Sequence, residues 1–422
     1  MRRNMSSQEI ILDIVQRAKK AFQQSANLTS PKKNAILERA AAKLEKSVGR
    51  IQEANEKDLS YAKEKGLSSA MVDRLTLNEK RISEMAQGLR DIIGLEDPVG
   101  KVVKGWTRPN GLRVEKVRIP LGVIGIIYES RPNVTVDAAG LCLKSGNVVI
   151  LRGGSEAIHS NKILGEILRE ALREEEVSED LVQVVPVTDR EAVGFLLEQD
   201  RYIDLIIPRG GEGLMKVLRD LSKIPVIKHD KGVCHIFVDH NADLDNAEKI
   251  VLNAKVQRPG VCNALETLLV DEKIAHQFLP RALEALKAQG VEIRGCERTR
   301  QLVDGIKAAT PEDWDAEYLD KILAVRIVDG IDGALKHIQE HGSMHTESIL
   351  TNDESNAERF LREVNASAVM VNSSTRFNDG GQLGLGAEIG ISTTKLHAFG
   401  PMGLEELTTQ KYVIRGEGQI RE

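Results

Sequence analysis

Aromatic side chains are scarce in this sequence of 422 residues, at only 3% of the total. Hydrophobic residues nevertheless reach 41%, so we expect cores built mainly from Leu, Ile, Val and Ala. A chain of this length is expected to fold as two or three domains. Acidic residues slightly outnumber basic ones, and the formal net charge is therefore −5. The sequence therefore lacks the electrostatic footprint of a nucleic-acid-binding protein.

Long apolar runs and paired cysteines are also missing. No stretch approaches the roughly 20 apolar residues that a membrane-spanning helix needs, and the opening MRRNMSSQEI has no apolar core of a signal peptide. No two cysteines form a CxxC pair; the four are Cys142, Cys234, Cys262 and Cys296. This spacing favours a reducing compartment over a disulfide framework. We therefore expect a cytoplasmic location and no membrane partner.

Neither GxGxxG nor GxxxxGK[ST] occurs, so the two commonest phosphate-binding fingerprints are missing. Two double-glycine turns are present instead, in VVILRGGSEA and DLIIPRGGEG, and each lies between an expected strand and an expected helix. A single such turn is more often only a tight turn, but backbone N–H groups in two adjacent turns favour a dinucleotide-binding crevice. The candidate residues are Arg152, Gly153, Gly154, Ser155, Arg209, Gly210 and Gly211.

The order of expected elements indicates an α/β protein. Helical periodicity runs through about the first 95 residues, with a capping box at Ser6 and Glu9 and further helix starts at Ser30-Pro31 and Asn78. Asn110-Gly111 predicts a hairpin turn. From residue 122 strands and helices alternate, and the alternation restarts near residue 234, which predicts parallel sheets covered by helices. A last strand is expected over LTTQKYVIRGEG.

The segment VQRPGVCNALETLLV offers a candidate nucleophile. Pro259-Gly260 turns the chain so that Cys262 lies in a loop before a buried strand, where a thiolate could reach a cleft. A structural core role is commoner for cysteine, and Cys142 and Cys234 fit that role. Arg376, in the polar segment NSSTRFNDGG, is a candidate anion ligand.

The candidate metal ligands in the sequence are histidines. His337 and His341 have the i,i+4 spacing of a metal pair, but the following strand offers no evident third ligand. We therefore predict a solvated helix end there and no metal.

These motifs resemble the aldehyde dehydrogenase superfamily. PLGVIGIIYESRPN followed by LKSGNVVILRGG is similar to its cofactor domain, and QRPGVCNALETLLV, STRFNDGG and KLHAFGPMGLEELTTQKY are similar to the γ-glutamyl phosphate reductases within it. The resemblance runs from near the N-terminus to about Tyr412. It implies an aldehyde-dehydrogenase-like α/β fold with three parts. These are a Rossmann-like NADPH-binding domain (1–102 and 121–233), an α/β catalytic domain (234–398) and a small β oligomerisation element (103–120 and 399–422).

The resemblance also implies an activity. This is the NADPH-dependent reduction of L-glutamyl 5-phosphate to L-glutamate 5-semialdehyde in proline biosynthesis, through a thioester on Cys262. Asn133 is then the candidate oxyanion donor, and the candidates for binding substrate phosphate or carboxylate are Arg131, Arg258 and Arg376. Expected partners are further copies of the chain, as a homodimer or larger homo-oligomer, and glutamate 5-kinase.

Two departures from the family pattern bear on the alternatives. His229 stands about where hydrolytic aldehyde dehydrogenases carry a glutamate base, which disfavours an oxidising aldehyde dehydrogenase. Phe399 stands where relatives usually have arginine, which mildly favours an inactive scaffold subunit, whereas the intact Cys262 argues against one. A cysteine hydrolase is the third alternative, but no convincing Cys–His order supports it.

Overall fold

The computed structural model describes residues 5–227 and 231–421, which form two compact units. Unit 1 combines the described residues up to 227 with the returning segments 385–390 and 402–421. Unit 2 combines residues 231–384 and 391–401. The predicted boundary at residue 233 lies a few residues beyond this division, and the return of 385–390 to unit 1 had no signal in the sequence.

Helices precede the first sheet of unit 1, as the periodicity predicts: α1 (Ser7–Ser25), α2 (Ser30–Lys46), α3 (Val48–Glu64), α4 (Ser69–Leu75) and α5 (Glu79–Gly94). The capping box between Ser6 and Glu9 is confirmed, and Asn78 caps α5. The predicted cap at Ser30 is wrong by one residue, because Thr29 is the N-cap of α2. The Ser30 hydroxyl instead donates to Asp97 at 2.7 Å.

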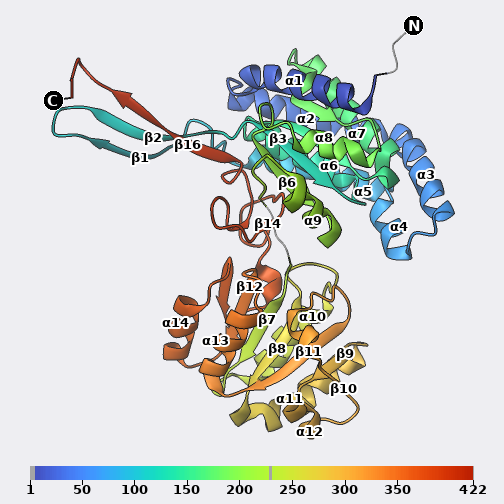
Figure 1. The fold of residues 1–422 in the computed structure, drawn as a ribbon, viewed down its shortest axis with the longest axis vertical. Coiled ribbons are helices and arrows are strands. Elements are labelled where there is room, and N and C mark those ends of the chain that lie inside the picture. Colours follow the sequence, from blue (N-terminus) through green and yellow to red (C-terminus); the bar gives the residue numbers. More distant parts are fainter. Residues whose placement is uncertain (1–4, 228–230, 422) are drawn as a thin grey trace. The chain divides into compact units, whose positions relative to one another are not determined.

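The main sheet of unit 1 is parallel, with strand order β5-β4-β3-β6. Its strands are β3 (Val123–Tyr128), β4 (Val148–Gly153), β5 (Val182–Val184) and β6 (Leu205–Arg209). The connecting helices are α6 (Asn133–Lys144), η1 (Ser155–Ala157), α7 (Ile158–Glu174), η2 (Glu179–Leu181) and α8 (Arg190–Leu197), and α9 (Glu212–Leu221) follows β6. Because β4 and β5 lie on one side of β3 and β6 on the other, the carboxyl ends of β3 and β6 flank a topological switch point (Figure 1).

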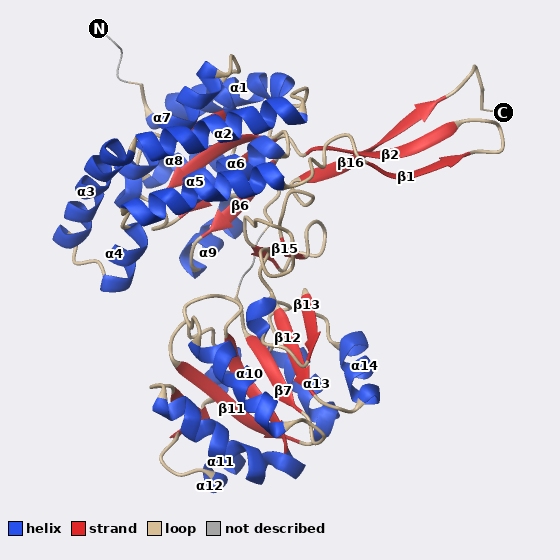
Figure 2. Ribbon diagram, turned by 180° about the vertical axis from the view of Figure 1, so that it is seen from behind, coloured by secondary structure: helices blue, strands red, loops and turns tan. Residues whose placement is uncertain are grey.

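A second, antiparallel sheet extends from the helical body of unit 1 (Figure 2). It contains β1 (Val102–Thr107), β2 (Arg113–Pro120) and β16 (Thr408–Arg415), with β2 in the middle. Gly111 has the positive φ of 89° that the predicted hairpin turn requires. The two segments predicted as one oligomerisation element therefore pair with each other inside one chain. We call this sheet the arm.

Unit 2 is built on a seven-stranded parallel sheet of order β10-β9-β11-β8-β7-β12-β13. Its strands are β7 (Cys234–Val238), β8 (Leu265–Asp271), β9 (Glu292–Gly295), β10 (Lys307–Ala308), β11 (Ile322–Val328), β12 (Thr346–Leu350) and β13 (Ala368–Val371). Its helices are α10 (Leu244–Val256), α11 (Glu272–Ala288), α12 (Glu297–Leu302), η3 (Pro311–Asp315), α13 (Gly330–His341), α14 (Glu354–Glu363) and η4 (Thr375–Phe377). The short strands β14 (Ile391–Ser392) and β15 (Gly400–Pro401) form a separate antiparallel pair.

Two apolar clusters cover the unit 2 sheet. One packs α10 and α11 against it around Phe278, and the other packs α13 and α14 around Phe360. The sequence predicted the longer strands of this sheet and a strand ending at Cys296, which is β9, but missed β10, which has two residues. Such short strands carry too little periodicity to be recognised without their partners.

Candidate functional site

Cys262 lies in a tight turn between α10 and β8, at the end of the unit 2 sheet where its parallel strands β7 and β8 begin. The Ala264 amide donates to the carbonyl of Val261 at 3.0 Å, which closes the turn. Cys262 is half-buried. A side chain on Gly232 would place its Cβ only 2.1 Å from the Cys262 carbonyl oxygen. The approach to β7 therefore packs directly against the backbone of Cys262, and this contact requires glycine.

The other cysteines differ from Cys262 in burial or position. Cys234 is fully buried, and its thiol donates to the Cys262 carbonyl at 3.1 Å. Burial raises the pKa of Cys234 well above its usual value, and burial likewise raises the pKa of Cys142. Both thiols are therefore held in the protonated, unreactive form. Cys296 is half-buried but follows β9, so it lies at the carboxyl ends of the strands, whereas Cys262 lies at their amino ends.

Arg376, on η4, is held beside the cysteine turn by two side chains. Its Nε donates to Gln257 Oε1 at 2.9 Å, and its Nη1 donates to Asn263 Oδ1. Asn263 is itself fixed, because its Nδ2 donates to the Asn378 carbonyl at 2.8 Å. Burial lowers the pKa of Arg376, and the nearby charge of Arg258 lowers it further. A second positive charge in the neighbourhood of the Arg376 guanidinium group favours a bound anion.

The structure thus brings together Cys262, Arg258 and Arg376, which the sequence singled out separately. The sequence missed Gln257 and Asn263, although both lie in the quoted segment around the cysteine. The sequence shows that both residues lie close to Cys262 in the chain, but it does not show their hydrogen bonds to Arg376, which is more than a hundred positions away.

The remaining predicted site residues belong to unit 1. Asn133 begins α6, and its Nδ2 donates to Asp137 Oδ2 at 2.9 Å. Burial raises the pKa of Asp137 to about 6, although the Asn133 hydrogen bond and the charge of Arg209 oppose this shift. Arg209 also lies against Gly390, where an added Cβ would be 2.5 Å from its Nη1. Arg131 is half-buried in the loop before α6.

The two double-glycine turns differ in free space. Arg152 is only 9% exposed, and it donates to the carbonyls of Gly153 at 2.9 Å and Thr188 at 3.1 Å. A Cβ on Gly153 would lie 2.0 Å from Asn161 Nδ2, so packing fills this first turn.

The second turn is open at Gly211 but not at Gly210. A Cβ on Gly211 would meet no atom within 4 Å, whereas one on Gly210 would lie 2.6 Å from Glu129 Oε2, the atom to which the Gly211 N–H donates at 3.1 Å. This turn lies at the N-terminus of α9 and at the switch point between β3 and β6. The open space at Gly211 and the helix N-terminus fit a phosphate of a dinucleotide, which would take the place of Glu129 at the Gly211 N–H.

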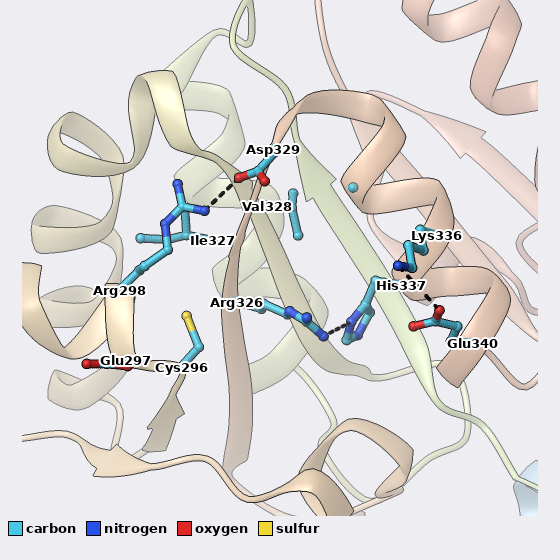
Figure 3. Close-up of a pocket in the computed structure, with 11 residues that line it drawn as sticks. Cys296, Glu297, Arg298, Arg326, Ile327, Val328, Asp329, Lys336, His337 and Glu340 are labelled. Carbon is cyan, nitrogen blue, oxygen red and sulfur yellow. Dashed lines mark hydrogen bonds and ion pairs between the residues drawn. The ribbon is translucent and has the colours of Figure 1, made fainter.

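A cavity of about 470 Å³ lies in unit 2 at the carboxyl ends of β9 and β11, away from the cysteine turn (Figure 3). Its charged lining residues are largely paired. Arg298 binds Asp329 at 2.6 Å and Arg326 donates to His337 Nδ1 at 2.9 Å. The cavity contains none of the predicted site residues.

The predicted solvated helix end is wrong for His337, which is only 2% exposed, and His337 and His341 are both engaged with other side chains. Arg326 holds His337, as above, and burial lowers the pKa of His337 to about 2, with the charges of His235, Arg326 and His341 adding to the effect. His341 pairs with Asp315 at 2.9 Å. The absence of a metal there stays a prediction.

His229, considered as a base, lies outside the described residues. Phe399 is 36% exposed, with Lys395 Nζ 5.7 Å from its ring centre.

Across the part of the chain that the structure describes, no helix is both long and apolar enough to cross a membrane.

Comparison with known proteins identifies the family. The sequence profile of the Aldehyde dehydrogenase family matches residues 2–298. A gamma-glutamyl phosphate reductase of Desulfatibacillum aliphaticivorans is 58% identical over 99% of this chain and 100% of its own length. This chain belongs to the γ-glutamyl phosphate reductases of the aldehyde dehydrogenase family. A gamma-glutamyl phosphate reductase of Geotalea daltonii is 57% identical, again over 99% of this chain and 100% of its own.

Solved structures agree with this family membership. The crystal structure of gamma-glutamyl phosphate reductase from Thermotoga maritima superposes with a TM-score of 0.96 at 50% identity, over 98% of this chain and 100% of that chain. The predicted family and the aldehyde-dehydrogenase-like α/β fold are therefore confirmed. Membership of the aldehyde dehydrogenase family implies a nicotinamide cofactor.

Proposed function

We propose that this chain reduces L-glutamyl 5-phosphate to L-glutamate 5-semialdehyde with release of phosphate, in proline biosynthesis. Full-length similarity to gamma-glutamyl phosphate reductases supports the substrate class. The observation that carries the chemistry is the half-buried thiol of Cys262 in a turn beside two guanidinium groups. A thiol nucleophile next to an anion-binding group suits attack on an acyl phosphate.

The first half-reaction forms a thioester. The Cys262 thiolate attacks the acyl carbon, a C–S bond forms, and the C–O bond to phosphate breaks with the electron pair leaving on phosphate. Arg376, fixed by Gln257 and Asn263, offers a planar pair of donors for the departing phosphate or the substrate carboxylate. The carbonyl oxygen becomes negatively charged during the attack, and the candidate donor for it is Asn133, which Asp137 orients.

The second half-reaction takes the thioester to the aldehyde. A nicotinamide cofactor held by this chain would supply the hydride for this reduction. The C–S bond then breaks, the aldehyde leaves, and the Cys262 thiolate is restored. The candidate cofactor residues are the turn Arg209–Gly211, which contacts Glu129, and the exposed Ser155, which begins η1 after β4.

We propose NADPH as the cofactor. Glu156, the acid nearest to the first turn in sequence, accepts hydrogen bonds from Ser130 N at 2.6 Å and Ser130 Oγ at 3.0 Å. Its carboxylate is therefore engaged by protein groups rather than free to bind a ribose 2′-hydroxyl, the usual NAD-selecting contact. The test is kcat/KM for NADPH and NADH under the same conditions, and equal values would contradict this choice.

We further propose that the protein forms a homo-oligomer in the cytoplasm and that it binds glutamate 5-kinase. The arm supports assembly, because its outer strands leave apolar side chains exposed: Val102 (50%), Val103 (47%), Tyr412 (60%) and Ile414 (60%). Open strand edges with apolar side chains are commonly covered by another chain.

The reaction is tested most directly in reverse. The protein is mixed with L-glutamate 5-semialdehyde, phosphate and NADP+, and formation of reduced cofactor is followed. Phosphate-dependent reduction is expected. Turnover that does not depend on phosphate would instead identify an oxidising aldehyde dehydrogenase. A protein that assembles but shows no turnover would identify a scaffold subunit.

A further inference from the structure

We propose that Asp239, His240 and Asp271 form a binding site for a divalent transition-metal ion of the Zn²⁺ type, and that the bound ion stabilises unit 2. The three residues lie at the carboxyl ends of β7 and β8, whereas Cys262 lies where β8 begins. The site is therefore separate from the reaction proposed above. The sequence predicted no metal site, and no pattern in it joins these three residues.

The parallel pairing of β7 with β8 brings the two aspartates together. Val238 is the partner of Val270 in this pairing, so Asp239 and Asp271 follow at matching positions. His240 comes next in the chain, and its Nδ1 lies 3.0 Å from Asp239 Oδ1 and 3.9 Å from Asp271 Oδ2. Ligand atoms of all three residues lie within 4.8 Å of one another.

These spacings suit a zinc ion. Zinc binds imidazole nitrogen and carboxylate oxygen at about 2.0–2.2 Å, so ligand atoms around a tetrahedral ion lie roughly 3.4 Å apart. The two distances from His240 Nδ1 lie on either side of that value. The His240 side chain is 38% exposed, which gives the ion a path from solvent. A mixed nitrogen and oxygen set favours a transition ion over Mg²⁺, which prefers oxygen ligands.

One oxygen of Asp271 points to a ligand independently of this clustering. Asp271 is 1% exposed, and its Oδ1 accepts the Lys273 N–H at 2.9 Å as the N-cap of α11. Its Oδ2 is also buried, but it accepts a hydrogen bond from none of the described residues. His240 Nδ1, at 3.9 Å, is too far away to donate one. A buried acceptor without a partner costs free energy, and a metal ion bound to it would remove that cost.

Asp239 is held so that it also has one oxygen at the shared space. Asp239 is fully buried, and its Oδ2 accepts hydrogen bonds from Thr351 Oγ1 at 2.7 Å and Asn356 Nδ2 at 2.9 Å. Its Oδ1 lies beside His240 Nδ1. Carboxylates that bind metals are commonly oriented by hydrogen bonds of this kind from neighbouring side chains.

The charges of the cluster also favour a cation. Among the described residues, neither Asp239 nor Asp271 forms an ion pair with a lysine or an arginine. Glu266, a comparably buried acid of the same unit, pairs with Lys255 at 2.6 Å. Buried carboxylates are usually paired or bound to a metal, and these two have a single imidazole between them.

The competing explanation is that the aspartates only cap and support loops, and that water fills the space beside Asp271. Isothermal titration of the full chain with Zn²⁺ separates the two, using wild type, Asp271→Asn and His240→Ala. Asparagine is as good an N-cap as aspartate, so Asp271→Asn removes the ligand charge and keeps the cap of α11. Asp304→Asn, the same change at an exposed position of unit 2, is the matched control.

We expect wild type and the control to bind one Zn²⁺ that Asp271→Asn and His240→Ala each bind at least about 10- to 100-fold more weakly. Zinc at 100 times its dissociation constant should raise the unfolding temperature of unit 2 by about 5 to 10 °C in wild type. The same concentration should leave that temperature unchanged in both variants. Zinc held by the Cys262 thiol would persist in both variants, so it cannot imitate this result.

Absence of zinc binding by wild type would overturn the inference and leave water in the space. Equal binding by wild type and both variants would overturn it as well, because the ion would then lie elsewhere. If Asp271→Asn fails to fold, His240→Ala decides, since its half-exposed side chain can be removed without opening the core. Displacement of the zinc by an equal concentration of Mg²⁺ would contradict the nitrogen ligand.

Discussion

Arg376 donates a hydrogen bond to the side-chain oxygen of Asn263, the residue that follows Cys262. This bond joins η4 to the nucleophile turn across more than a hundred residues of sequence. Together with the bond to Gln257 it fixes both the position and the plane of the guanidinium group. We expect that fixed plane to matter for anion binding, because two-point recognition of phosphate or carboxylate needs it.

Arg376→Lys should therefore be a severe change despite keeping the charge, because lysine supplies a point charge without the planar fork. We expect KM for phosphate in the reverse reaction to rise roughly 10- to 100-fold, the range of one hydrogen bond to a charged group. Steady-state kinetics at varied phosphate measure it. Arg362→Lys on α14, where the side chain is 71% exposed, is the control and should leave KM unchanged.

Cys262→Ser should lower turnover by about 10⁴-fold or more, because a hydroxyl replaces the attacking thiolate. The fold should persist, since Cys262 is half-buried and serine is slightly smaller. Cys296→Ser, at the other half-buried cysteine, should retain full activity. Similar losses in the two variants, with thermal stability intact, would remove Cys262 from the nucleophile role.

Oxidation of the semialdehyde should depend on phosphate. A thioester on Cys262 needs an acceptor, and without a dedicated base water should be a poor one. A general base typically contributes about 10²- to 10⁴-fold, so the phosphate-free rate should be lower by that range. The measurement is NADP+ reduction with and without saturating phosphate. Equal rates would mean that the thioester is hydrolysed and would argue for an oxidising dehydrogenase.

The raised pKa of Asp137 should appear in the pH dependence of stability. Because this pKa is about 6 in the folded protein, above its usual value, the folded state holds the proton more tightly than the unfolded state. Ionisation therefore costs folding free energy as the pH rises from about 4 to about 7, by up to about 3 kcal/mol.

Asp137→Asn removes that cost while keeping an oxygen acceptor for Asn133. The free energy of unfolding of the variant, minus that of wild type, should rise by up to about 3 kcal/mol between pH 4 and pH 7. Urea titrations at each pH provide the values. A difference that stays flat with pH would contradict the raised pKa.

The exposed apolar residues of the arm should control assembly. Ile414→Asp places a charge on β16 where the side chain is 60% exposed, so it should weaken association without unfolding the chain. Light scattering should show a smaller mass for this variant than for wild type at equal concentration. Thr409→Asp, at an exposed position on the same strand, is the matched control. A monomeric wild type would contradict the proposed assembly directly.

Local patterns in the sequence were enough for much of the fold. Capping at Ser6 and Asn78 and the hairpin at Asn110-Gly111 depend on interactions within a few residues, and the strand over residues 265–271 is marked by a continuous apolar run. The structure confirms each of them. The cap of α2 was misplaced by one residue because Thr29 and Ser30 are both residue types that favour the N-cap position. In the structure Thr29 takes that position without a side-chain capping hydrogen bond, and the Ser30 hydroxyl donates to Asp97.

The sequence by itself determined the family, the order of helices and strands, and the cysteine most suited to be a nucleophile, because these depend on long motifs and on short-range backbone preferences. Only the tertiary structure decided what surrounds that cysteine. Arg376 donates to Asn263, and Gly232 packs on the backbone of Cys262. These contacts join residues that lie far apart in the chain. They form because the segments before β7 and β8 meet where these parallel strands begin, and the segment after β13 turns back to the start of β12, an arrangement that no local pattern encodes.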